Sequence, residues 1–152
     1  MDKKRILLLD DDVDRTAKIL ELFDPDYFLT KFFSIDARAS ESIYKNIINA
    51  SFKPDVVLAS IDLAYTPQKI FETVHSLAKK YPQVPIIGYS HYTSIYGIND
   101  VRKYGFTRVE NTLKGFESLA SYVREDISRL SVVGVGTLEL PIRADISLFS
   151  KN

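Results

Sequence analysis

The chain has 152 residues, of which 45% are hydrophobic and 26% charged, a balance typical of a single globular domain that buries its own core. The 20 basic residues equal the 20 acidic ones, so no basic excess favours direct nucleic-acid binding, and the absence of cysteine excludes disulfides and thiolate chemistry. No apolar run is long enough for a signal-peptide core or a membrane span, and we therefore expect a cytoplasmic protein without membrane contact.

The first half of the chain alternates short apolar runs with amphipathic segments. Ile6 to Leu9 is a continuous apolar run that ends at three aspartates, which is typical of a strand buried on both faces. Helical spacing of apolar residues follows over 16–23 and is broken by Asp24-Pro25-Asp26. The aromatic and β-branched segment 27–35 predicts a second strand, and apolar residues at steps of four predict a second helix over 37–50.

The second half continues the same alternation. The expected elements are, in chain order, a strand over 56–59, a helix beginning near Pro67, a strand over 85–89, a helix over 91–104, a short strand over 107–109 and a final helix over 116–130. The 91–104 helix has the weakest pattern, because Gly97 and several β-branched residues lie inside it. The final helix has the clearest apolar stripe of the chain.

Five strands that alternate with five helices predict an α/β fold, a doubly wound parallel sheet with helices on both faces. In such a sheet the functional groups gather at the carboxyl ends of the strands, where the strand order reverses. The residues that follow the predicted strands are Asp10 to Asp12, Ser60 to Asp62, Ser90, and Asn111 with Thr112. We therefore expect a functional site at this edge.

Four motifs occur in a characteristic order and spacing: Arg5 to Asp12, Pro54 to Ala59, Pro85 to Ser90, and Gly105 to Thr107. Together they resemble the receiver domain of bacterial two-component response regulators, over about residues 4–130. They are similar to that family's acidic opening strand, the strand before its phosphorylated aspartate, the strand ending in its switch hydroxyl, and the turn before its fifth strand. The resemblance implies a flavodoxin-like (βα)5 fold with strand order 2-1-3-4-5.

The resemblance also implies a role for each position of the phosphorylation pocket. Asp10 and Asp11 match the acidic pair that holds Mg²⁺, and Ser90 matches the switch hydroxyl. The acceptor aspartate falls on Ser60 and the conserved lysine on Thr112, so two parts of the pocket are replaced. Because serine cannot form an acyl phosphate and threonine carries no charge, we expect a degenerate pocket with no catalytic residue, and at most weak Mg²⁺ binding at the vestigial acidic pair.

These replacements predict a pseudo-receiver, which is not an enzyme and binds a protein partner independently of phosphorylation, through the face of the fourth helix, fifth strand and fifth helix. One alternative is a phosphorylatable receiver that uses Asp62 as acceptor, with Lys114 as its lysine; each lies two residues beyond the expected position. Another is the N-terminal regulatory domain of a longer multidomain signalling protein.

Aromatic residues and the two histidines allow weaker predictions. Tyr89, Tyr92 and Tyr96 form either packing contacts or an aromatic patch for a partner, and the sequence favours neither. His75 and His91 lie on different expected elements without partners at metal-ligand spacing, so we expect both at the surface.

Residues 131–152 do not fit the alternation and are expected to lie outside the 1–130 domain. Leu138 and Leu140 flank Glu139, the alternation of a half-buried strand, and Pro141 excludes a long helix through the centre. We expect an extended tail that docks on its own domain, on a second copy to form a homodimer, or on a downstream domain. A linker is the other interpretation.

Overall fold

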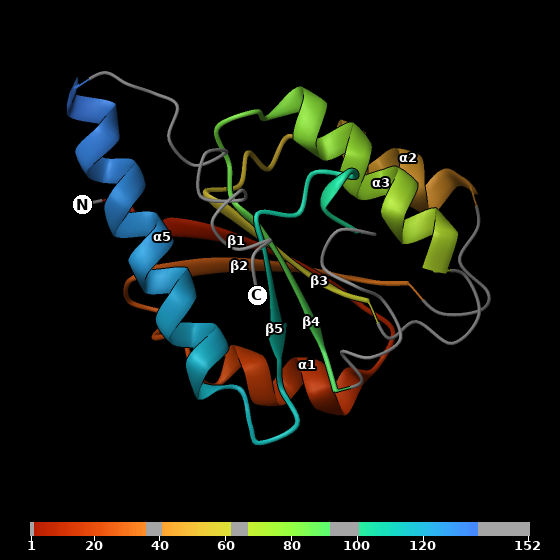
Figure 1. Ribbon diagram of the computed structural model, residues 1–152, viewed down its shortest axis with the longest axis horizontal. Coiled ribbons are helices and arrows are strands. Elements are labelled where there is room, and N and C mark those ends of the chain that lie inside the picture. The colour runs from red at the N-terminus through yellow and green to blue at the C-terminus, as the bar shows by residue number, and fades with distance from the viewer. Residues whose placement is uncertain (1, 36–40, 62–66, 92–100, 137–152) are drawn as a thin grey trace.

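The computed structural model describes residues 2–35, 41–61, 67–91 and 101–136 (Figure 1). Its strands are β1 (Lys4–Asp10), β2 (Phe28–Ser34), β3 (Val56–Ser60), β4 (Ile86–Ser90) and β5 (Arg108–Asn111), and its helices are α1 (Val13–Leu20), α2 (Glu41–Asn49), α3 (Pro67–Lys80) and α5 (Glu117–Gly136). The helix expected over 91–104 falls mostly outside the described residues. None of the described helices is both long and apolar enough to cross a bilayer.

The five strands form one parallel sheet in the order β2-β1-β3-β4-β5, which confirms the predicted fold class. The register pairs Leu9 with Ala59 and Ser60 with Tyr89, so the carboxyl ends of β1, β3 and β4 lie side by side. This alignment positions the polar residues that follow the apolar runs along one edge of the sheet.

The core consists of two apolar layers, one on each face of the sheet. Figure 1 shows α2 and α3 over one face and α1 and α5 over the other. Alternate residues of β1 divide between the layers: Leu7 and Leu9 pack under α2 and α3, whereas Ile6 and Leu8 pack under α1 and α5. All four are at most 2% exposed, and full burial of such a side chain contributes about 1.5–3 kcal/mol. This burial explains the continuous apolar run in the sequence.

The first helix begins earlier than the apolar pattern predicts. The Asp12 carboxylate accepts a hydrogen bond of 2.9 Å from the Arg15 backbone N–H, and this N-cap starts α1 at Val13. The cap directly after β1 leaves only a short connection, so the first turn of α1 lies against the carboxyl edge of the sheet. That position brings a basic side chain into the candidate site.

The last helix runs to Gly136, so the prediction that the chain is extended from residue 131 is wrong for residues 131–136. The valines in this segment suggested a strand, but valine costs only a few tenths of a kcal/mol more than alanine once a helix has nucleated. The expected tail strand around Leu138 to Leu140 lies outside the described residues.

Candidate functional site

Four polar residues predicted for the pocket converge at the carboxyl edge of the sheet. Asp10, Ser60 and Ser90 end β1, β3 and β4, and Thr112 directly follows β5. Their side chains are almost completely buried, with exposed fractions of 0%, 0%, 1% and 1%. The backbone N–H of Thr112 donates a 2.9 Å hydrogen bond to the Ser90 carbonyl, which continues the pairing of β4 and β5 beyond the strands. The fold therefore assembles the predicted pocket positions.

The guanidinium group of Arg15 lies against two of these residues, Asp10 and Ser60. Its Nε donates to Oδ2 of Asp10 at 2.9 Å and its Nη2 to Oδ1 at 2.6 Å, so it contacts both oxygens of one carboxylate. The same Nη2 lies 3.0 Å from Oδ1 of Asp11 and 3.4 Å from Oγ of Ser60. One internal cation thus contacts the acidic pair and the residue at the expected acceptor position.

Asp10 is the centre of this hydrogen-bond network. Besides the two bonds from Arg15, its Oδ1 accepts the backbone N–H groups of Asp11 at 2.7 Å and Asp12 at 3.0 Å. The Tyr89 hydroxyl donates to its Oδ2. A buried carboxylate is tolerated only when it is paired and its oxygens are hydrogen-bonded, and this network satisfies both conditions.

Tyr89 is part of the pocket and does not belong to a surface patch. Its side chain is 1% exposed, and its pairing with Ser60 directs it to the same face of the sheet as that residue. The packing interpretation of this tyrosine is therefore correct, with the addition that its hydroxyl reaches Asp10. Tyr92 and Tyr96 lie outside the described residues.

The electrostatics of the cluster keep its arginine charged and its tyrosine neutral. The hydrogen bond to Asp10 raises the pKa of Arg15 above its usual value, despite partial burial. Burial, and then the negative charge of Asp10, raise the pKa of Tyr89 well above 10.0. Burial also raises the pKa of Asp11, with further contributions from its neighbour Asp10, although Arg15 acts in the opposite direction.

On the other side of the pocket, a histidine takes part where the resemblance implies a lysine. Nδ1 of His91 lies 2.9 Å from Oγ1 of Thr112, and its ring centroid is 6.0 Å from that of Phe116. His91 is partly buried and keeps part of its surface exposed, and His75 is exposed, so both reach the surface as expected. The sequence pattern missed this contact because the two residues come from different connections.

The alternative acceptor, Asp62, lies outside the described residues. Its suggested partner Lys114 is described and is exposed, in the connection between β5 and α5. The structure therefore leaves the Asp62 hypothesis as a sequence-based alternative.

The donor set does not fit a resident Mg²⁺ ion. Mg²⁺ requires several oxygen ligands, preferably charged ones. The carboxylates of Asp10 and Asp11 are both engaged by Arg15, and Ser60 contributes a hydroxyl where a third carboxylate would be needed. Within the part of the chain that the structure describes, no group of three or more acidic, histidine or cysteine residues could hold a metal ion.

Comparison with known proteins gives matches among solved structures only: no protein-family model and no curated protein matches the sequence. A response regulator receiver domain protein from Clostridium thermocellum has 18% identity and a TM-score of 0.64, covering 86% of this chain and 98% of that one. The response regulator TrrA from Thermotoga maritima, solved in complex with Mg²⁺ and BeF, has 17% identity and a TM-score of 0.61, covering 81% and 98%.

A third structure, described as an adenylate cyclase from Rhodopirellula baltica, has 14% identity and a TM-score of 0.67, covering 88% of this chain and 93% of that one. At these identities the similarity establishes architecture, while function depends on the residues at the site. The strand order and the two helical layers agree with that architecture. The chain therefore has the fold of the response regulator receiver domain.

Proposed function

We propose that this chain is a pseudo-receiver, a signalling domain that binds a protein partner independently of phosphorylation. The observation that carries the proposal is the Arg15 guanidinium, which contacts Asp10, Asp11 and Ser60. In a phosphorylatable receiver these positions hold a cation and the acceptor carboxylate. Here the positive charge comes from the chain itself, so Arg15 offsets part of the negative charge of the acidic pair without a metal.

The chemistry of the remaining positions supports the same proposal. An acyl phosphate requires a carboxylate, and the residue at the acceptor position is Ser60. A phosphoryl group also needs positive charge opposite the acidic pair, but Thr112 is neutral and is engaged by His91. Because Ser60 accepts no phosphoryl group, the charge of the pocket stays constant. Phosphorylation therefore cannot shift the domain between two conformations.

The face of β5 and α5 is the proposed docking surface for the partner. Arg108 lies 4.2 Å above the ring centroid of Tyr122 and pairs with Asp126 at 3.3 Å, which orders the charges of this face. In the connection between β5 and α5, Leu113 is 68% exposed. Arginine and tyrosine are enriched where proteins bind one another, and an exposed leucine adds apolar contact area.

Intact-mass measurement after incubation with acetyl phosphate and Mg²⁺ tests the independence from phosphorylation. We expect no phosphate adduct on the wild-type chain, while a phosphorylatable receiver treated in parallel acquires one. An adduct that is labile in base and disappears in Asp62→Asn would overturn the proposal and establish the alternative acceptor.

A capture experiment tests the docking surface. Proteins captured from the native cell by the wild type should also bind Asp62→Asn but not Leu113→Asp.

A further inference from the structure

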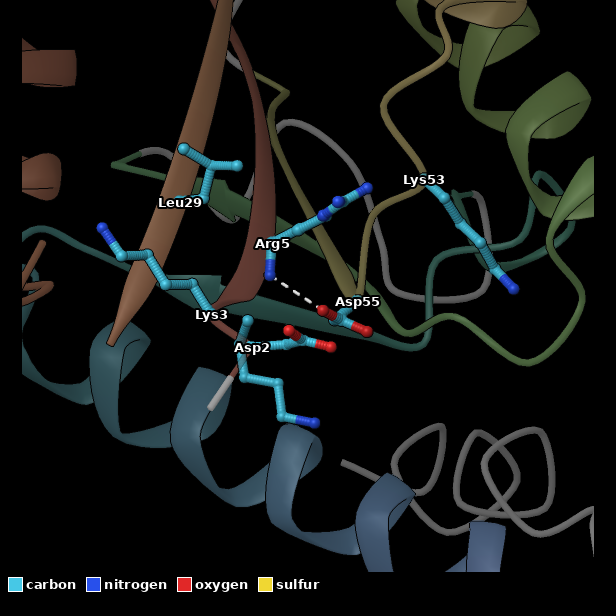
Figure 2. A pocket seen from close by; sticks show the side chains of 7 residues that line it. Asp2, Lys3, Arg5, Leu29, Lys53 and Asp55 are labelled. Carbon is cyan, nitrogen blue, oxygen red and sulfur yellow. Dashed lines mark hydrogen bonds between the residues drawn. The ribbon is translucent and has the colours of Figure 1, made fainter. Parts of the chain in front are cut away.

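A second polar surface lies at the opposite edge of the sheet, where β1 and β3 begin (Figure 2). It is a hollow of about 530 Å³ whose basic lining residues are Lys3, Lys4, Arg5 and Lys53. The six steps along β1 from Lys4 to Asp10, at about 3.3 Å each, separate this hollow from the Asp10 pocket by about 20 Å. It is therefore a separate surface from the proposed pseudo-receiver pocket.

Positive charge predominates in this hollow, although the whole chain has no net charge. Its two carboxylates are those of Asp2 and Asp55, against four basic side chains. Oδ2 of Asp55 accepts the Arg5 backbone N–H at 2.8 Å, as Figure 2 shows, so this carboxylate is held by the main chain. Among the described residues, no carboxylate forms an ion pair with any of the four basic side chains. The hollow thus has an excess of positive charge.

The hollow adjoins a second one, and the two together are called the groove below. The second, of about 230 Å³, shares Lys4, Lys53 and Asp55 with the first and extends to Val84 and Ile127. At the other end of the groove lies Leu29 of the edge strand β2, 45% exposed. The groove is basic at its centre and has apolar residues at both ends: Leu29 is open to solvent, whereas Val84 and Ile127 are each 7% exposed and offer only a small apolar surface.

We infer that this groove binds an acidic polypeptide segment of a partner protein in extended conformation. Carboxylates of the segment would face the basic centre, and flanking apolar side chains would contact Leu29 at one end and Val84 with Ile127 at the other. A small anion such as phosphate would use only the centre, which leaves the apolar ends without a role. Complementary charge accelerates encounter with such a segment and fixes its register.

Fluorescence anisotropy with a labelled synthetic peptide tests this inference, using three glutamates between two leucines. The double variant Lys4→Glu/Lys53→Glu should weaken binding by about tenfold, because it reverses two charges at the centre. Lys18→Glu/Lys114→Glu makes the same charge change at exposed positions away from the groove and should alter binding less than about twofold. Circular dichroism of all variants checks that the fold is kept.

Further peptides and anions decide what the groove recognises. A peptide with glutamines in place of glutamates should bind at least about tenfold more weakly, as should one with alanines in place of leucines. Equal binding of the glutamine peptide, an equal loss in both double variants, or no binding at all would overturn the inference. Displacement of the peptide by inorganic phosphate at a similar concentration would also overturn it, in favour of a small-anion site.

Discussion

Replacing Arg15 with alanine removes the internal cation of the pocket and leaves the Asp10 carboxylate, which is 0% exposed, without a counter-charge. Removing one partner of a buried ion pair costs about 3–5 kcal/mol. The Arg15 side chain is itself 15% exposed, so water reaches the vacated space and the cost should be near the lower limit, about 3 kcal/mol. That loss is a large share of a typical domain stability of about 5–15 kcal/mol.

Urea unfolding followed by circular dichroism at neutral pH measures this cost. Lys18→Ala is the matched control, because Lys18 is exposed on the same helix. Neutralising the carboxylate should remove most of the penalty, so Asp10→Asn and Arg15→Ala should show a coupling energy of about 2 kcal/mol in a double-mutant cycle. If Arg15→Ala costs no more than Lys18→Ala, the reasoning that Arg15 compensates a buried charge is refuted.

Three further predictions test the structure around the site. The Thr16 hydroxyl is buried without a hydrogen-bond partner in the described structure, so Thr16→Val should leave the free energy of unfolding unchanged or raise it by up to about 1 kcal/mol; a loss above about 1 kcal/mol would contradict this. Gly105→Ala should lower the melting temperature more than Gly115→Ala. Both glycines have positive φ, but only at Gly105 would the new methyl group lie 2.5 Å from the fixed Cβ of Ala78. Equal losses of melting temperature would refute the packing argument. Backbone hydrogen bonds hold the pKa of Asp12 below 3.8. Asp12→Ala should therefore cost about 1 kcal/mol of stability at pH 7, and this cost should shrink as pH falls below 3.8 in urea titrations. A cost independent of pH would contradict the role of Asp12 as the N-cap.

Most of the fold could be predicted from sequence because periodicity reports burial directly. The apolar run Ile6 to Leu9 predicted a strand covered on both faces, and the structure buries all four side chains. Element ends were less predictable, since they depend on single hydrogen bonds such as the Asp12 cap. Residues 131–136 were predicted wrongly because propensity is a weak signal beside the continuation of an existing helix.

The pocket positions could be predicted, but the residues that fill the pocket could not. Asp10, Ser60 and Ser90 follow from where apolar runs end, as a parallel sheet requires. Arg15 was missed because it lies on a helix and does not follow an apolar run. The sequence signal was its spacing: Arg15 comes five residues after Asp10 and four after Asp11, so its side chain can reach both carboxylates. The Tyr89 hydroxyl was missed because its contact depends on the register between strands, which periodicity does not give.

Amide NMR of the chain titrated with Mg²⁺ and beryllofluoride tests the central claim most directly. The claim is that the Arg15 guanidinium takes the place of the metal ion, so the pocket binds neither Mg²⁺ nor a phosphoryl group. We predict no saturable shifts at Ser60, Ser90 and their neighbours, and unchanged signals from the Arg15 side chain. Saturable shifts centred on these residues, with displacement of the Arg15 signals, would contradict the account.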